Sequence, residues 1–353
     1  MGILVVGLWP FHAARNDVGW LSQGNGFRFG KRGSVVSAGR FEARRSQAGS
    51  SCSLEIWLEP SYVDSGGTVL AFYWPTIRVA PFVLRQFVSG LELQRRSRDR
   101  SVPNARIYVD AVFSHLQPIF LTISSGETGT AVYVDGMLVK KSASFRFSSE
   151  DLTGQLIMGN APSASNNWSG RVNRLVIYDR ELPPAEVSQH FSDRTKSKQA
   201  DLAKSEGVIA SYLFNEGKGN VIHNQLDAGP NLLIPERYFV IHEQLLELPW
   251  GEFHSRWSYW VDVGVNIFGF VPLGFFFRAY FSAVRKIKRP TWRTIAFGFA
   301  ISLTIEALQS FLPTRNSGMT DLMTNTFGTA LGAILCAWSM KHNWLTRAGI
   351  AIA

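Results

Sequence analysis

Cysteine is nearly absent from this chain of 353 residues, which contains only Cys52 and Cys336. Cys52 lies in a predicted strand and Cys336 in a long apolar run, so we expect the two thiols not to meet in a disulfide. Neither residue belongs to a metal-binding or redox motif. The sequence therefore gives no sign of a disulfide scaffold or of thiol chemistry.

A concentrated basic surface is lacking as well, although the formal net charge is +9. The lysines and arginines are scattered or lie beside apolar runs, so the charge indicates membrane topology and surface rather than a nucleic-acid partner. One local group comprises Arg95, Arg96, Arg98 and Arg100. It could contact an anionic polymer or lipid headgroups, but a solvated hairpin turn is the favoured interpretation.

Long apolar runs are confined to the last third of the chain, where the ordinary apolar fraction of 46% hides them. They cover about residues 257–278, 295–312 and 322–340. Each approaches the roughly 20 residues that a helix needs to cross the hydrocarbon core of a membrane. We therefore predict three transmembrane helices within residues 257–340, with a domain boundary near Pro235, where the composition changes.

The loop between the first two runs predicts the orientation of these helices. It contains no acidic residue, and short basic loops of this kind stay on the cytoplasmic side. Its basic residues are Arg285, Lys286, Lys288, Arg289 and Arg293. Residues 313–320 and everything before residue 257 are then expected on the external side, and the tail 341–353 in the cytoplasm.

Residues 1–12 are strongly apolar but only about half as long as a membrane span. They have no basic start and no small-residue cleavage site, so a cleaved signal peptide fits poorly. Two interpretations remain: a buried strand of the next domain, or the end of a transmembrane helix whose beginning is missing. The second is favoured, because a large external domain must be carried across the membrane.

Residues 24–235 alternate between apolar and polar side chains and are interrupted repeatedly by turn residues, which predicts an all-β sandwich or barrel. The sharpest local signal is Asp135-Gly136 between apolar residues, typical of a type I′ hairpin turn. A retaining glycosidase on such a sheet needs two carboxylates about 5 Å apart. No Glu-x-Asp-x-x-Glu strand supplies them, so an enzymatic β domain is disfavoured.

Four segments of this region together resemble the laminin-G-like, concanavalin A-like jelly-roll family. They are 53–60 (SLEIWLEP), 131–139 (AVYVDGMLV), 156–160 (LIMGN) and 169–187 (SGRVNRLVIYDRELPPAEV). The resemblance implies a sandwich with a short helix at 184–190, and relatives that bind glycans, proteins or calcium. Residues 211–219 resemble an early strand of the family, and their late position suggests a permuted edge strand.

The ligand of this domain is only weakly indicated. Trp168, flanked by Asn166 and Asn167, could stack on a sugar at a loop tip, although packing onto the sandwich is the favoured alternative. No cofactor is predicted, and no residue pattern supports calcium. Residues 236–256 read as an amphipathic helix, which either lies on the outer leaflet or packs on the sandwich.

Polar side chains interrupt the three apolar runs at helical spacings. Asp262 and Asn266 are four residues apart, Glu306 and Gln309 three, and Asp321 and Asn325 four, so each pair shares one helix face. The orientation places all of them at the external end, beside the loop that carries Arg315 and Ser317. Lipid offers no hydrogen bonds, so the three polar faces are expected to meet inside the bundle, and ionisable groups within membrane spans are candidate functional residues by default.

Small residues in the apolar runs predict close approach between the helices. They are Gly264, Gly269 and Gly274 in the first run, and Gly328 and Gly332, spaced by four, in the last.

These residues carry a second resemblance, to the VanZ-like family of bacterial membrane proteins. The matching segments are 266–275 (NIFGFVPLGF), 302–309 (SLTIEALQ), 312–317 (LPTRNS) and 321–332 (DLMTNTFGTALG). The family resemblance implies a location in the cell envelope and, from its founding member, lowered susceptibility to a glycopeptide antibiotic. Such proteins usually begin with a further span, so the jelly roll would be inserted between the first and second spans.

Three interpretations of the polar cluster remain open. It is a hydrogen-bonded lock between helices, or a pocket for a headgroup or cell-wall precursor in which Arg315 contacts phosphate or carboxylate, or an intramembrane enzyme with Glu306 or Asp321 as general base. The third is least favoured, because no nucleophile or metal-ligand set accompanies the acids.

The sequence therefore predicts a multi-pass protein of the bacterial inner membrane: an external all-β jelly roll followed by an all-α transmembrane bundle. The expected partners are membrane lipid and a glycan, a cell-wall precursor or an envelope protein. Binding or shielding of such a component is favoured over catalysis.

Overall fold

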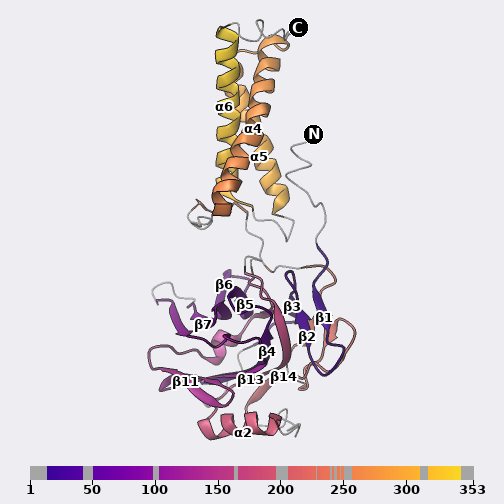
Figure 1. The fold of residues 1–353 in the computed structure, drawn as a ribbon, viewed down its shortest axis with the longest axis vertical. Coiled ribbons are helices and arrows are strands. Elements are labelled where there is room, and N and C mark those ends of the chain that lie inside the picture. The colour runs from indigo at the N-terminus through magenta and orange to yellow at the C-terminus, as the bar shows by residue number, and fades with distance from the viewer. Residues whose placement is uncertain are drawn as a thin grey trace. The chain divides into compact units, whose positions relative to one another are not determined.

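The computed structural model describes residues 14–42, 51–97, 103–162, 166–195, 206–227, 229–238, 241, 245–246, 248–249, 257–310 and 317–342. The chain divides into a β unit, Ala14–His242, and a helical unit within Glu243–Ala353. Figure 1 shows both units. The predicted partial span at 1–12 and most of the amphipathic segment 236–256 lie outside the described residues.

The β unit is a sandwich of two antiparallel sheets. In spatial order, the first sheet contains β1 (Val18–Trp20), β2 (Phe27–Phe29), β13 (Gly170–Tyr178), β4 (Cys52–Pro60), β9 (Ile119–Gly126), β10 (Gly129–Val134) and β11 (Met137–Ser142), with β14 (Val208–Tyr212) paired to β13. The second contains β15 (Val221–Ile222), β16 (Leu232–Leu233), β3 (Val35–Ser37), β12 (Gln155–Met158), β5 (Ser65–Trp74), β6 (Val79–Val88), β7 (Gly90–Arg95) and β8 (Ala105–Val109).

The core of the sandwich lies between the two sheets, because inward residues alternate with outward ones along each strand. Leu54, Ile56 and Leu58 of β4 are fully buried, as are Phe82 and Leu84 of β6. The predicted all-β sandwich is therefore confirmed.

The predicted hairpin at Asp135-Gly136 is also confirmed, since it joins β10 to β11 with both residues at positive φ, 52° and 77°. The last part of the β unit, residues 206–238, contributes strands to both sheets. β14 pairs with Leu175–Tyr178 of β13, beyond the residues that pair with β2, and β16 pairs with β3. This placement agrees with the predicted late edge strand.

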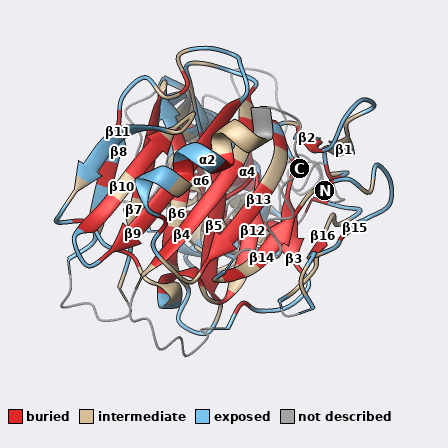
Figure 2. Ribbon diagram, turned by 90° about the horizontal axis from the view of Figure 1, so that it is seen from below, coloured by how far each residue is buried: buried red, intermediate tan, exposed pale blue. Residues whose placement is uncertain are grey.

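A short 3₁₀ helix, η1 (Ser149–Leu152), precedes β12, and one α-helix, α2 (Pro184–Thr195), lies across the outer face of the first sheet (Figure 2). α2 begins at a proline, which suits a first turn because its missing N–H has no helical partner there. Leu182 and Val187 pack on Val176 and Tyr178 of β13, so this outer face is buried. The predicted helix at 184–190 is confirmed and extends to Thr195.

The helical unit contains α4 (Trp257–Ala283), α5 (Pro290–Gln309) and α6 (Met319–Lys341), with α6 packed against both others. Three helices are found where three were predicted, but α5 begins at Pro290, five residues before the apolar run at 295–312, and ends at Gln309. Hydropathy marks only the apolar part of a helix, whereas Pro290 starts the helical hydrogen bonding earlier.

Among the described residues, one helix is long and apolar enough to cross a membrane. It is Tyr259–Ala283, with a mean hydropathy of 1.6 over its most apolar window, of which only 17% is buried within the protein. A core helix of a soluble protein would be mostly buried, so its exposed apolar surface favours lipid contact. Neither α5 nor α6 is both long and apolar enough by the same criteria, so the prediction that they also cross the membrane stays a proposal.

Small residues bring α6 close to the other helices. A Cβ added at Gly328 or Gly332 would overlap the carbonyl oxygens of Ile267 and Val271 in α4, respectively. Gly274 lies equally close to the backbone of Thr329. The expected close approach at these positions is confirmed, as in other helix pairs with small residues spaced by four.

The same expectation is wrong for Gly264 and Gly269. A Cβ added at either position would meet nothing within 4 Å, so these glycines face open space rather than a neighbouring helix.

Candidate polar site in the helical unit

Three hydrogen bonds link the helices at one end of the unit. Asn266 Nδ2 of α4 donates to Asp321 Oδ1 of α6 over 2.7 Å, and Asn325 Nδ2 of α6 donates to Ser302 Oγ of α5 over 3.0 Å. Each bond therefore joins two different helices, as the shared faces of the sequence pairs predict.

The third bond joins Glu306 to the start of α6. Glu306 is 1% exposed, and its Oε2 accepts the backbone N–H of Gly318, the N-cap residue of α6, over 2.8 Å. The N–H groups at a helix start have no helical acceptor, and the helix dipole favours negative charge there. A buried carboxylate at this place therefore stabilises the beginning of α6.

The remaining predicted residues are placed unequally. Gln309 is 8% exposed, and Ser317, 1% exposed, accepts the backbone N–H of Leu246 through its hydroxyl over 3.2 Å. Asp262 is exposed, one turn before Asn266, so the prediction that it meets the other polar groups inside the bundle is wrong. Arg315 lies outside the described residues.

Sequence reasoning left Ser302 and the Gly318 backbone out of the site, although both bond directly to it. Ser302 lies four residues before Glu306, on the same helix face, and that spacing was the available signal.

The cluster is rich in hydrogen-bond acceptors. Asn325 is 4% exposed, and among the described residues its Oδ1 has no hydrogen-bond partner. Asp321, one turn before Asn325 on α6, is partly exposed, and Asp262 is exposed at the same end of the unit. An arrangement of carboxylates and amide oxygens can receive hydroxyl or ammonium donors.

The opposite end of the unit has the reverse charge. Arg278 of α4 donates from Nε to Thr291 Oγ1 of α5 over 3.0 Å, and its Nη1 lies 3.4 Å from Met340 Sδ of α6. The basic loop residues 285–289 carry four exposed cationic side chains here, and Lys341 is exposed as well. Acidic and basic groups are thus separated along the helices.

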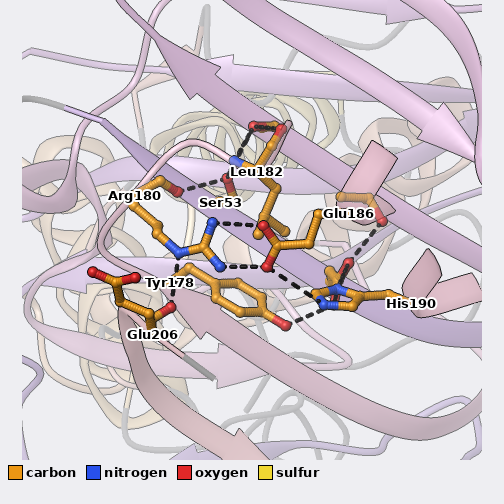
Figure 3. A network of polar contacts seen from close by, with 10 residues as sticks. Ser53, Tyr178, Arg180, Leu182, Glu186, His190 and Glu206 are labelled. Atoms are coloured by element: carbon orange, nitrogen blue, oxygen red, sulfur yellow. Dashed lines mark hydrogen bonds and ion pairs between the residues drawn. The ribbon is translucent and has the colours of Figure 1, made fainter. Parts of the chain in front are cut away.

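A second polar network lies in the β unit, beneath α2 (Figure 3). Glu55 of β4 is 1% exposed and accepts hydrogen bonds from the Tyr178 hydroxyl over 2.8 Å and from Thr122 Oγ1 over 3.3 Å. His190 Nδ1 of α2 lies 3.0 Å from the same carboxylate. Glu55 therefore ties α2 to three neighbouring strands of the sheet, β4, β9 and β13.

An arginine completes this network. Arg180 pairs through its guanidinium with Glu186 of α2, which lies 3.5 Å from His190 Nε2. The hydrogen bond from Arg180, opposed by partial burial, holds the pKa of Glu186 below its usual value. Burial, followed by the charge and hydrogen bond of Glu55, raises the pKa of Tyr178 far above its usual value. Tyr178 therefore serves as a fixed hydrogen-bond donor.

The position of His190 predicts a pH-dependent attachment of α2. Burial, the largest single influence, opposes its charged form, but the hydrogen bond and charge of Glu55, with the charge of Glu186, outweigh it and raise the pKa of His190. A pKa raised by folding stabilises the folded state below the unfolded value of about 6.5, and that stabilisation is lost as pH rises through the folded pKa. We expect amide protection in α2 to fall as pH increases through that window.

Hydrogen–deuterium exchange, corrected for intrinsic rates, measures this effect. His190→Gln should remove the pH dependence, whereas His223→Gln, at an exposed histidine that also faces a glutamate, should retain it. A pH profile that is the same in the wild type and His190→Gln would contradict the assignment.

The predicted sugar-binding residues of the β unit do not form an exposed platform. Trp168 is 1% exposed and donates from Nε1 to Gln86 Oε1 over 3.0 Å, so the favoured packed alternative is the one observed. Asn167 Oδ1 accepts the Tyr238 hydroxyl over 2.6 Å, while Asn166 is half-buried.

Other predicted features of the β unit are placed as follows. Arg95 pairs with Asp151 over 3.1 Å, Arg96 is exposed, and Arg98 and Arg100 lie outside the described residues. Among the described residues, no group of three or more histidine, cysteine or acidic side chains could hold a metal ion. Both cysteines are free and buried.

The fold and the polar site together define a two-part protein, an antiparallel jelly-roll sandwich followed by three apolar helices. Residues 31–188 match the family model of the concanavalin A-like lectin/glucanases superfamily, and residues 208–340 match that of the VanZ/LLP1 family. Both suspected resemblances are confirmed. The VanZ/LLP1 match begins at β14, so it includes strands that the structure places in the sandwich.

Solved structures with low similarity include receptor-binding domains of botulinum neurotoxins. That of type D is 14% identical, with a TM-score of 0.39, and the match covers 52% of this chain and 48% of the other. That of type G is 12% identical, with a TM-score of 0.38 and coverages of 51% and 45%. The chain thus spans about half the length of these structures. No curated protein matches the chain.

Proposed function

We propose that this chain is a multi-pass protein of the bacterial cell envelope that binds envelope components on the external side of the inner membrane. In this proposal the sandwich binds carbohydrate, and the polar cluster of the helical unit receives the headgroup of a lipid-linked cell-wall precursor. The two family matches support the envelope location and the carbohydrate-binding type of domain.

The surface of the helices supports membrane insertion. Large apolar side chains are exposed on all three helices, including Phe268 at 76%, Phe299 at 43% and Phe327 at 55%. Exposed tryptophans occur near both ends of the unit, at Trp257 and Trp292, as is typical of membrane interfaces. The basic end would then be cytoplasmic, and the acceptor-rich end and the sandwich external.

The observation that carries the headgroup proposal is the buried, acceptor-rich cluster around Glu306. Its interhelical hydrogen bonds also suit a lock, but a lock alone leaves the buried Asn325 Oδ1 without a partner. Sugar hydroxyls or an amine of a precursor could donate a hydrogen bond to that oxygen and another to the carboxylate of Asp321. A protein that bound the headgroup of the precursor would also shield it from a glycopeptide antibiotic.

Charge-neutral substitutions separate binding from locking. Glu306→Gln and Asp321→Asn retain an oxygen acceptor for Gly318 and Asn266 but remove the negative charge. We expect each variant to insert and fold but to bind a lipid-linked cell-wall precursor about tenfold more weakly, a difference of about 1.4 kcal/mol. The measurement uses the full chain in lipid nanodiscs. Thr304→Val is the control, because the Thr304 hydroxyl donates to the carbonyl oxygen of Ala300 within α5.

The outcomes of this experiment are distinct. Unchanged precursor binding in both variants would leave the cluster as a structural lock. Mass spectrometry of the incubated precursor should show no covalent change. Turnover that is lost in Glu306→Gln would instead establish the alternative function, intramembrane hydrolysis or transfer with Glu306 or Asp321 as the acid–base group.

A further inference from the structure

Two aromatic side chains are exposed together on the outer face of the second sheet. Phe87 of β6 is 47% exposed and Tyr108 of β8 is 39% exposed, and their rings meet edge to face with centroids 6.1 Å apart. The neighbouring inward residues, Leu84 and Ile107, are buried in the core. The aromatic pair therefore belongs to the surface and contributes nothing to the packing between the sheets.

The backbone between these strands is shaped to hold the pair. Phe87 lies opposite Gly90 in the β6–β7 register, and a Cβ at Gly90 would overlap the phenol ring of Tyr108. The absent side chain lets Tyr108 lie across β7, where its hydroxyl is 3.5 Å from the Phe87 carbonyl oxygen. Val88, at φ 54°, makes the turn and is 47% exposed.

An ionic group borders the aromatic pair on the same face. Glu92 of β7 lies opposite Arg85 and Tyr108, and its side chain is only 11% exposed. Arg85 Nη1 approaches Glu92 Oε2 at 3.4 Å and Arg106 Nη1 approaches Oε1 at 3.8 Å. Arg85 also lies over the Phe87 ring, 5.5 Å from its centroid. The arrangement fixes the carboxylate and leaves a net charge of one positive unit.

Arg106 carries the more accessible of the two positive charges. Its side chain is 69% exposed, and its contact with Glu92 is long, so most of its guanidinium donors face solvent. Aromatic residues and arginine are enriched at interaction surfaces relative to the rest of a protein surface. A guanidinium binds a carboxylate through two parallel hydrogen bonds.

We propose that this face, defined by Arg85, Phe87, Glu92, Arg106 and Tyr108, binds an acidic saccharide. The apolar face of a sugar ring stacks on the aromatic pair. Glu92 accepts hydrogen bonds from the hydroxyl groups of the sugar, and the carboxylate of the sugar pairs with Arg106. A lipid surface is a poorer match, because Glu92 partly neutralises both arginines at this face. The inference rests on the proposed carbohydrate-binding function of the sandwich and names the site and the ligand class.

The test is a titration of the full chain in nanodiscs of neutral lipid with two oligosaccharides of equal length, one of hexuronic acid and one of neutral hexose. We expect tighter binding of the acidic oligosaccharide. Phe87→Ala and Tyr108→Ala should each weaken that binding about tenfold or more, and Arg106→Gln about tenfold. Arg106→Gln should leave the weaker neutral binding unchanged, because only the carboxylate contact is lost.

Matched substitutions on the first sheet serve as controls. Arg171→Gln removes an exposed arginine that pairs with Glu59 over 3.4 Å, and Met137→Ala removes a side chain that is 71% exposed. Both should bind the acidic oligosaccharide like the wild type. An aromatic or Arg106 variant that bound like these controls would overturn the assignment while leaving the sandwich a carbohydrate-binding domain.

Two further results overturn the proposal in different ways. If neither oligosaccharide binds the wild type, the carbohydrate-binding function fails together with the site. The wild type could instead bind added vesicles that contain anionic phospholipid and bind no saccharide. If Phe87→Ala, Tyr108→Ala and Arg106→Gln then lose the vesicle binding, the face is a membrane contact.

Discussion

Replacing Gly332 by leucine is expected to separate α6 from α4 and to give the largest loss of stability in the helical unit. A Cβ at Gly332 would overlap the carbonyl oxygen of Val271, and a leucine side chain would add three further carbon atoms at the same place. Backbone cannot yield as a flexible side chain can, so the two helices must move apart. Overpacking of this kind costs about 1–3 kcal/mol even where side chains can shift.

Unfolding of the full chain in mixed micelles of increasing dodecyl sulfate content measures this loss. We expect Gly332→Leu to unfold at a much lower dodecyl sulfate fraction than the wild type. Gly264→Leu is the matched control, because a Cβ at this position of α4 would meet nothing within 4 Å. Equal losses in the two variants would mean that leucine acts through something other than the α4–α6 contact.

The contrast between these glycines shows how far the sequence predicts helix packing. The spacing of Gly328 and Gly332 by four correctly predicts a shared close face. Gly264 and Gly269 are equally small, but their spacing of five places them on different sides of α4. Only the position of α6 determines which glycine of α4, Gly274, meets a neighbour.

For the polar site, too, helical spacing predicts which residues share a face but not which of them meet a neighbouring helix. Asn266, Asp321 and Asn325 could be predicted because each occurs at helical spacing from another polar residue in an otherwise apolar run, and two of them do bond to each other. Asp262 satisfies the same spacing rule yet is exposed, because helical period alone does not say where a helix end leaves its neighbours.

The network beneath α2 could not be predicted in this way. Glu55 and His190 are 135 residues apart and lie in a strand and a helix, so nothing local in the sequence pairs them. Glu55 also occupies an outward position of β4, which normally indicates solvent. α2 covers that position, and the cover depends on the fold of β13 and the turn that follows it. The exposed pair of Phe87 and Tyr108 was missed for a different reason, because aromatic residues in strands usually indicate core.

Replacing Trp168 by alanine is expected to give the largest loss of stability in the β unit. The indole is 1% exposed and meets Phe29 edge to face with ring centroids 6.0 Å apart. It also fills the space above Gly170, where a Cβ would overlap its ring. Truncation of a buried aromatic side chain to alanine costs about 3–5 kcal/mol, and Gln86 Oε1 would lose its indole donor.

Urea-dependent hydrogen exchange of peptides from β4 and β9 measures this loss in the full chain, because these peptides report on the sandwich separately from the helices. Trp168→Phe keeps most of the ring volume and should cost less than Trp168→Ala. Both variants should bind saccharide like the wild type wherever they remain folded, because Trp168 supports the sandwich from within. Unchanged stability in Trp168→Ala together with lost saccharide binding would instead place the indole at a sugar-binding surface.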